Sequence, residues 1–235
     1  MEIFLQLTLL LAFFVQAAAG FGPALVAMPI LIQLVGPEVA SPLFILTMQT
    51  SGVGLMWRYR RSFNFGHIWR LLLAALLAIP LGSLLASGVE RTLVLTTLGI
   101  LLMGYALYGL FGPALPQLPQ HRWAYTLGVA AGILHGAYNV GGPPLVMYSN
   151  SQDWHPFEFK SNLRFIFFVL NWGVIFSHFA QGHYTAFVLR MYLLSIPVSV
   201  VGLAIGFSLD RFIEPQRFRK AVFVILLFLG LSLIF

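Results

Sequence analysis

The stretch Asn139-Val-Gly-Gly-Pro-Pro144 interrupts a long apolar run, and a similar stretch, Ala19-Gly-Phe-Gly-Pro-Ala24, lies 120 positions earlier. Glycine leaves the backbone free to turn. Proline suits the first turn of a helix, where the amide hydrogen that it lacks would have no partner anyway. Each stretch is therefore expected to end one helix and to begin another at once. We expect two broken helices at membrane depth, each with a fresh helix N-terminus at its break.

The composition predicts a membrane protein. Of the 235 residues, 59% are hydrophobic and 9% are charged, whereas a soluble domain carries about 25% charged residues. We therefore predict an all-α polytopic membrane protein with a single membrane domain over residues 1–235. The net charge of +6 comes mostly from short loops between apolar segments, which is typical of orientation signals and not of a nucleic-acid surface. The chain has no cysteine, and no metal or cofactor is expected.

The apolar segments lie at residues 3–19, 23–35, 39–57, 68–87, 92–111, 123–139, 143–152, 157–179, 184–209 and 221–235. A helix needs about 20 residues to cross the hydrocarbon core of a bilayer. The second and seventh segments, with 13 and 10 residues, are therefore too short to cross it. Both follow a Gly-Pro break. Two short, interrupted segments at matching places in two halves of a chain point to a transporter binding site.

The two halves align over residues 19–93 without a gap at the offset of 120. The matched pairs include Gly22 with Gly142, Pro23 with Pro143, Glu38 with Glu158, Ser41 with Ser161, and Gly82 with Gly202. We predict two repeats of five helices, at about 1–112 and about 123–235, joined by a Pro-rich linker at 113–122. In each repeat the first and second helices form the broken pair. The alternative is that the two Gly-Pro kinks belong to unrelated helices.

Loop charge predicts that the repeats are inverted. Arginines at 58, 60, 61 and 70 lie between the third and fourth segments, whereas in the second half the cluster at 211–220 lies one connection later. Since positively charged loops mark the cytoplasmic side, the two halves should have opposite orientations. Each half then needs five crossings, so each short segment counts as one. We place both termini outside and the linker inside.

The helix starts at the two breaks are the first candidates for chemistry. The first turn of a helix leaves amide hydrogens unpaired and carries about half a positive charge. In hydrocarbon these groups need a partner, and an oxyanion approaching over glycine is a good one. Water or a neighbouring carbonyl is the alternative. The residues assigned to the site here are Gly20, Phe21, Gly22 and Pro23 at the first break, and Gly141, Gly142 and Pro143 at the second.

Polar side chains at membrane depth in the second half are His135, Tyr138, Asn139, Asn162, Arg164 and Asn171, and all but Asn171 are assigned to the substrate site. His135 lies one turn before Asn139 on the same helix face and is a candidate proton carrier, although a lone histidine is more often structural. The asparagines can instead bond neighbouring helices, and Arg164 can reach the headgroups. The carboxylates all fall at segment ends or in loops, which argues against a carboxylate site for protons or sodium.

The paired motifs, Gly-x-Gly-Pro at 20–23 and Gly-Gly-Pro-Pro at 141–144, resemble those of the TauE/SafE (TSUP) transporter family. The turn Glu158-Phe159-Lys160 also matches, although the family more often has arginine at the third position. The resemblance covers about residues 5–233. It implies a membrane transporter of sulfite, sulfoacetate, related sulfonates or other small sulfur-containing anions, often directed outward. Residues 134–139 are bulkier and more polar than the Gly-rich run usual in the family, so the substrate could differ.

We expect a multi-pass protein of the bacterial inner membrane that exports such an anion by alternating access, with the anion held between the two helix N-termini. The membrane potential favours anion export by about 2.3 kcal/mol per charge per 100 mV, so no coupling ion is required. Expected partners are the small anion and the lipid bilayer, and a homodimer is left open. Other interpretations are a carrier or channel for a carboxylate, a structural membrane subunit, and an intramembrane enzyme, for which no catalytic motif is found.

Overall fold

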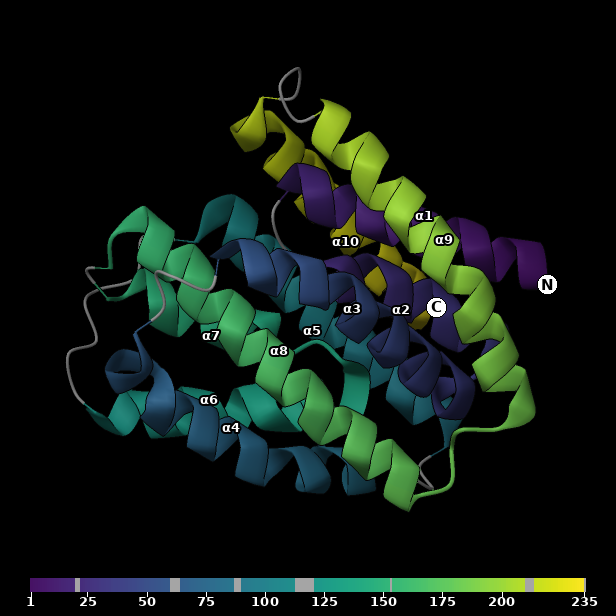
Figure 1. Cartoon of the computed structure of the whole chain (residues 1–235), viewed down its shortest axis with the longest axis horizontal. Coiled ribbons are helices and arrows are strands. Elements are labelled where there is room, and N and C mark those ends of the chain that lie inside the picture. Colours follow the sequence, from purple (N-terminus) through teal and green to yellow (C-terminus); the bar gives the residue numbers. More distant parts are fainter. Residues whose placement is uncertain are drawn as a thin grey trace. The chain divides into compact units, whose positions relative to one another are not determined.

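The computed structural model describes residues 1–19, 22–59, 64–86, 90–112, 121–152, 154–209 and 214–234. Over these ranges the chain forms ten α-helices and no strand (Figure 1). They are α1 (Glu2–Ala19), α2 (Pro23–Val35), α3 (Pro37–Tyr59), α4 (Phe65–Ala86), α5 (Arg91–Phe111), α6 (His121–Tyr138), α7 (Gly142–Asn150), α8 (Pro156–Ala180), α9 (Ala186–Leu209) and α10 (Pro215–Ile234). Each predicted apolar segment corresponds to one helix, which confirms the all-α fold.

Two helices begin three or more residues earlier than the apolar runs that predict them. α10 begins at Pro215, six residues before its apolar run, because proline suits the first turn and polar residues such as Arg217 and Lys220 then continue the helix. α4 begins at Phe65, where the side-chain oxygen of Asn64 accepts a hydrogen bond from the Gly66 N–H at 3.0 Å. Helix starts of this kind depend on capping and not on hydropathy.

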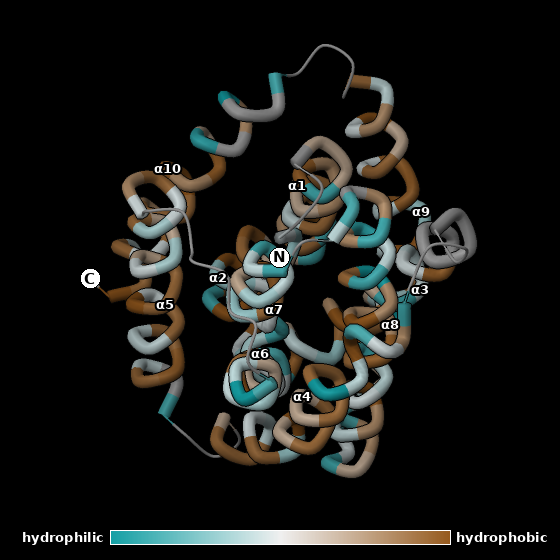
Figure 2. Tube along the Cα trace, turned by 90° about the vertical axis from the view of Figure 1, so that its left-hand side faces the viewer, coloured by the Kyte–Doolittle hydropathy of each residue, from teal (hydrophilic) through white to brown (hydrophobic). Residues whose placement is uncertain are grey.

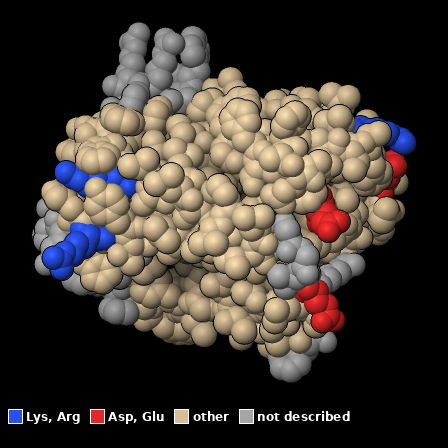
Figure 3. Space-filling view, turned by 90° about the horizontal axis from the view of Figure 1, so that it is seen from below, with Lys and Arg blue, Asp and Glu red and all other residues tan. Residues whose placement is uncertain are grey.

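The described helices include four that are long and apolar enough to cross a bilayer: α4, α5 over Thr92–Phe111, α8 over Phe157–Ala180, and α9. Large apolar side chains such as Leu77, Phe176 and Phe207 are exposed on these helices. Hydrophobic residues dominate the helices in Figure 2, and charged side chains are sparse on the face that Figure 3 draws. Apolar surface on this scale needs lipid to cover it, so the chain is a polytopic membrane protein.

The chain folds into two compact units, which are described separately. Unit 1 comprises Met1–Thr47, Gly88–Pro113 and Thr185–Phe235, and unit 2 comprises Met48–Ser87 and Ala114–Tyr184. Helix α3 begins in unit 1 and ends in unit 2. Each unit therefore takes helices from both predicted halves of the chain, and the repeat boundaries stay a prediction. Most of the predicted linker, at 113–120, lies outside the described residues, as do Arg60, Arg61 and Arg211.

In unit 1 the short helix α2 is surrounded by longer ones. α1 packs along α9, α5 packs along α10, and α2 contacts α1, α5 and α10. Nearly all of α2 from Pro23 to Ile32 is buried. Gly202 lets α9 approach α1 closely, because a methyl group there would lie 2.6 Å from the carbonyl oxygen of Leu10. Since small residues drive such close packing in membranes, the glycine fixes how α9 sits on α1.

In unit 2 a stripe of glycines joins α6 to α4. Gly128, Gly132 and Gly136 are spaced one turn apart on α6, and a Cβ at any of them would collide with the α4 backbone. The α4 carbonyls that they face are those of Leu71, Ala75 and Ile79, in the same order along the chain. The two helices therefore run parallel at close range, as small-residue interfaces permit.

Helix α8 runs parallel to α4 as well. Near their starts, Nδ1 of His67 lies 2.7 Å from a carboxylate oxygen of Glu158, and near their ends the Gln181 amide donates a hydrogen bond to the Ser83 hydroxyl at 2.6 Å. The helices α4, α6 and α8 thus begin at the same end of unit 2. It follows that α7, which contacts α6 and α8, carries the chain back from the end of α6 toward the start of α8.

Candidate functional site

The first break lies in unit 1 between α1 and α2. Gly22 adopts the left-handed conformation, with φ 75°, and Pro23 opens α2 as predicted. The carbonyl of Gly22 accepts a hydrogen bond from the Leu25 N–H at 3.1 Å, which begins the new helix. A side chain here would be strained, and its Cβ would lie 2.9 Å from Leu25 Cδ1. Two residues assigned to this site, Gly20 and Phe21, lie outside the described residues.

The second break lies in unit 2 between α6 and α7. Asn139 is the non-glycine residue with a positive φ, 58°, among the described residues, and its N–H donates to the His135 carbonyl at 2.9 Å. Gly141 is the N-cap of α7 and supplies no side-chain cap, and Pro143 lies in the first turn. The structure thus confirms a second helix start at the predicted place. No capping side chain bonds to this start, where Gly142 carries an amide N–H and Pro143 and Pro144 carry none.

The second break lies at the mid-span of α8. Nε2 of His135 donates a hydrogen bond to Oδ1 of Asn171 at 3.1 Å. Asn171 is fifteen residues after the start of α8 and nine before its end, or about 22 Å and 14 Å at about 1.5 Å per residue. His135, Tyr138 and Asn139 are all buried, with exposures of 3%, 9% and 3%. Polar groups therefore gather near the middle of a long apolar helix.

Close packing against His135 explains the glycine at 141 and leaves room at 142. A Cβ at Gly141 would lie 2.8 Å from both His135 Cβ and the Ala131 carbonyl oxygen. A Cβ at Gly142 would meet only the Phe167 ring, at 3.7 Å, which is ordinary contact. The Phe167 ring also flanks the imidazole of His135, with the ring centroids 6.0 Å apart. Gly141 is thus needed for packing, whereas the packing does not require glycine at 142.

The structure separates the α8 residues that the sequence assigns to the site. Arg164 precedes Asn171 by seven residues, so the two share a face of α8 about 10 Å apart along its axis. Asn162 precedes Asn171 by nine residues and lies on the opposite face. Its Oδ1 accepts a hydrogen bond from the Asn64 N–H at 2.8 Å. Asn162 therefore lies beside the start of α4 and not beside Asn139.

Asn171 is the α8 residue that contacts His135, yet the sequence does not assign it to the site. The available signal is its spacing of seven from Arg164 within an apolar segment, which places both on one face. The partner on α6 could not be found in this way, because a helical period does not say which neighbouring helix a face meets.

The far end of α7 is tied to α4 and α8 by an aromatic cluster. The rings of His67 and Trp154 stack with centroids 6.1 Å apart, and the ring of Tyr148 meets Trp154 edge-on at 6.2 Å. The contact between His67 and Glu158 closes the cluster. With both ends held, the nine-residue helix α7 has a defined direction, from the break to the start of α8.

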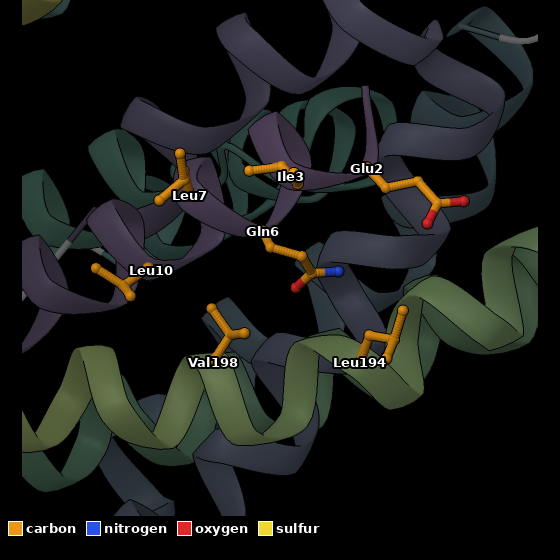
Figure 4. Close-up of a pocket in the computed structure, with 7 residues that line it drawn as sticks. All are labelled: Glu2, Ile3, Gln6, Leu7, Leu10, Leu194 and Val198. Carbon is orange, nitrogen blue, oxygen red and sulfur yellow. The ribbon is translucent and has the colours of Figure 1, made fainter.

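A groove of about 300 Å³ lies in unit 1 between α1 and α9 and contains none of the residues assigned to the site (Figure 4). Its walls are mainly apolar, and Gln6 in its lining donates a hydrogen bond to the Met191 carbonyl at 3.3 Å. An open apolar groove of this kind does not offer the converging polar groups that an anion needs.

Comparisons with known proteins agree on one family. The model of the family "Sulfite exporter TauE/SafE" matches residues 5–233. The "Probable sulfite/organosulfonate exporter TauE" of Cupriavidus necator is 29% identical over 236 residues, which cover 93% of this chain and 88% of the relative. No solved structure matches. The family consists of transporters, which excludes the intramembrane enzyme. The chain therefore belongs to the sulfite exporter TauE/SafE family.

Proposed function

We propose that the protein exports small sulfur-containing anions, such as sulfite or organosulfonates, across a bacterial inner membrane. The observation that carries this proposal is the start of α7 at mid-span, where Gly141 supplies no side-chain cap. The N–H groups of Gly141 and Gly142 at this start suit the oxygens of a sulfite or sulfonate group, whereas Pro143 and Pro144 have no N–H. The family match and the exporter of Cupriavidus necator support a sulfur oxyanion over other anions.

In this proposal the anion is held between the N-termini of α2 and α7, and the protein works by alternating access. Asn139 adds hydrogen bonding at the second break, and Arg164 adds positive charge on the face of α8 that carries Asn171. A monovalent anion that crosses without a compensating charge is driven outward by the membrane potential, by about 2.3 kcal/mol per 100 mV.

The helix pairs support the inverted repeat that this mechanism uses. At the offset of 120, α4 corresponds to α9 and α6 corresponds to α1, and these helices form the pairs α4–α6 and α1–α9. Gly82 and Gly202, matched by the same offset, each face the backbone of the partner helix, at Ile133 and Leu10. Both pairs run parallel, as the predicted topology requires.

Gly142 offers the sharpest test, because a methyl group fits at this position. Flux of labelled sulfite and sulfoacetate is measured in proteoliposomes for Gly142→Ala and Gly142→Leu. We expect Gly142→Ala to keep the thermal stability of the protein and to lower the flux severalfold, because the added Cβ keeps oxygens away from the α7 amides. Gly142→Leu should abolish the flux.

The matched control is Gly104→Leu on α5, where an added Cβ meets nothing within 4 Å. It should transport as the wild type does. Unchanged flux in Gly142→Leu would overturn the proposed site. Competition by carboxylates and not by sulfur oxyanions would overturn the proposed substrate class.

A further inference from the structure

The imidazole of His135 carries a hydrogen-bonding atom with no partner. The Asn171 oxygen can only accept, so the hydrogen in the bond between them belongs to Nε2. In the neutral ring the other nitrogen, Nδ1, then holds a lone pair. Nδ1 is buried and makes no hydrogen bond. A buried polar atom in this condition needs an explanation, and a ligand is one.

The backbone beside the His135 ring affects which form of the ring can use both of its nitrogens. The His135 ring lies near the backbone of Asn139. The N–H of Asn139 is already used, since it donates to the His135 carbonyl at 2.9 Å. The Asn139 backbone therefore offers the ring a carbonyl oxygen, which repels the lone pair of a neutral ring. Only the protonated ring can donate on both sides, to Asn171 and toward the break.

A buried imidazolium needs a negative charge beside it, because an isolated buried charge is strongly unfavourable. The break supplies the place for one. The ring packs against Gly141, the N-cap of α7, where an anion would meet the N–H groups of Gly141 and Gly142. The proton and the anion then stabilise each other.

We propose that the anion at the second break binds together with one proton, held on Nδ1 of His135, and that Asn171 is a positioning residue that places this proton. The inference rests on the proposed function and names its ligand class, a sulfur oxyanion taken up with one proton. The proton comes from solution and forms an N–H bond, and no bond of the anion changes. A monovalent anion then adds no net charge to the site.

Other titratable groups on the helices packed against α6 lie farther along. On α4, α7 and α8 they are His67, Arg70, Tyr148, Glu158, Lys160, Arg164 and His178. Arg164 and His178 each lie seven residues from Asn171 on its face of α8, about 10 Å away along the axis. Glu158 is thirteen residues away. The positive charge of Arg164 opposes a proton on His135 in the empty site, and a bound anion offsets both charges.

The test measures proton uptake when methanesulfonate or sulfoacetate binds to the purified full-length protein. Both anions stay ionised near neutral pH. Calorimetric titrations at about pH 7.5, above the ordinary histidine pKa of about 6.5, in buffers with different protonation enthalpies give the number of protons taken up. We expect about one proton per anion in the wild type, and an affinity that falls about tenfold per pH unit as the pH rises.

The variants assign the proton to its residue. His135→Gln should bind with no proton uptake and with an affinity that does not depend on pH. Asn171→Leu should lower the uptake, because the ring loses the acceptor that sets its protonation. His155→Gln, which changes an exposed histidine at the start of α8, is the matched control and should keep the full uptake.

Binding by the wild type without proton uptake overturns this inference and leaves the proposed function intact. Uptake of one proton by His135→Gln would also overturn this inference and leave the proposed function intact. The wild-type measurement decides the matter even where a variant fails to fold. If neither these sulfonates nor sulfite binds, the proposed function and this inference fall together.

Discussion

Each of the two breaks contains a left-handed residue, which lies at the start of α2 in unit 1 and at the end of α6 in unit 2. In unit 1 the left-handed residue is Gly22, with φ 75°, and Pro23 follows at once. In unit 2 it is Asn139, with φ 58°, and Gly141 and Gly142 come between it and Pro143. Glycine takes this conformation without strain, and asparagine is among the few other residues that tolerate it. Each break therefore needs a residue that tolerates the left-handed conformation, but the polarity of its side chains can differ.

The chemistry is concentrated at the second break. His135, Asn139 and Asn171 gather there near mid-span, whereas at the offset of 120 Asn139 corresponds to Ala19 and His135 to Val15. A repeat alone does not demand such polar residues in one copy. In the proposed function, unit 2 would contribute the specific recognition of the anion, and the first break would contribute a helix start. The following predictions test how far the two regions are equivalent.

The largest loss of stability is expected at Gly82 and Gly202, which correspond at the offset of 120 and each pack against a partner helix. Gly82→Val and Gly202→Val would each drive a side chain into the backbone of the partner helix, at Ile133 and at Leu10. Backbone atoms cannot move aside as a side chain can, so each variant should lose about 3 kcal/mol of stability or more. Thermal unfolding in detergent measures this, together with the yield of folded protein.

The matched controls are Gly104→Val in unit 1 and Gly52→Val in unit 2, where an added Cβ meets nothing within 4 Å. Both should unfold near the wild-type temperature. Loss of stability at one matched glycine and not at the other would show that the repeat does not extend to helix packing.

Substitutions of the left-handed residues should change stability less, and they should affect the two breaks differently. Gly22→Ala places a side chain in the left-handed region and should cost about 1–2 kcal/mol. Asn139→Gly relieves the same strain at the second break, so its stability should stay within about 1 kcal/mol of the wild type. Its flux should nevertheless fall, because the side chain of Asn139 is lost. If Asn139→Gly transports normally, the second break works through its backbone alone.

Much of the fold could be predicted from the sequence because it depends on local signals. Runs of apolar residues predict each helix, and the Gly-Pro pairs predict the starts of α2 and α7. The start of α10 was placed too late because hydropathy does not detect a polar first turn after Pro215. The close approach of α6 to α4 was not predicted. The glycines at 128, 132 and 136 allow this close approach, but their spacing does not predict which helix packs against them.

The site was predictable at its backbone and less so at its side chains. Gly141, Gly142 and Pro143 lie at the start of α7 as expected, because their residue types determine local conformation. Which asparagine of α8 meets His135 depends on the rotation of α8 about its own axis. That rotation follows from long-range packing, such as that of Gly173 against Ile79 of α4. As a result, Asn162 contacts Asn64, and Asn171 is the asparagine that contacts His135.

The smallest loss of stability is expected from removing the exposed contact between α8 and α4. The contact between His67 and Glu158 is 2.7 Å long, and their side chains are 51% and 23% exposed. Exposed pairs contribute little because water and salt screen them. Glu158→Gln should therefore cost less than about 1 kcal/mol, and the loss should shrink as salt is added.

The buried hydrogen bond between Asn171 of α8 and His135 provides a comparison for the stability loss of Glu158→Gln. Asn171→Leu leaves the Nε2 hydrogen of His135 without its partner in a buried place, which should cost about 1–3 kcal/mol and respond little to salt. Thermal unfolding of both variants at low and high salt makes the comparison. A larger loss for Glu158→Gln would mean that α8 is held mainly at its exposed start. The packing around the second break would then be free to rearrange, and the fixed geometry inferred for His135 would not hold.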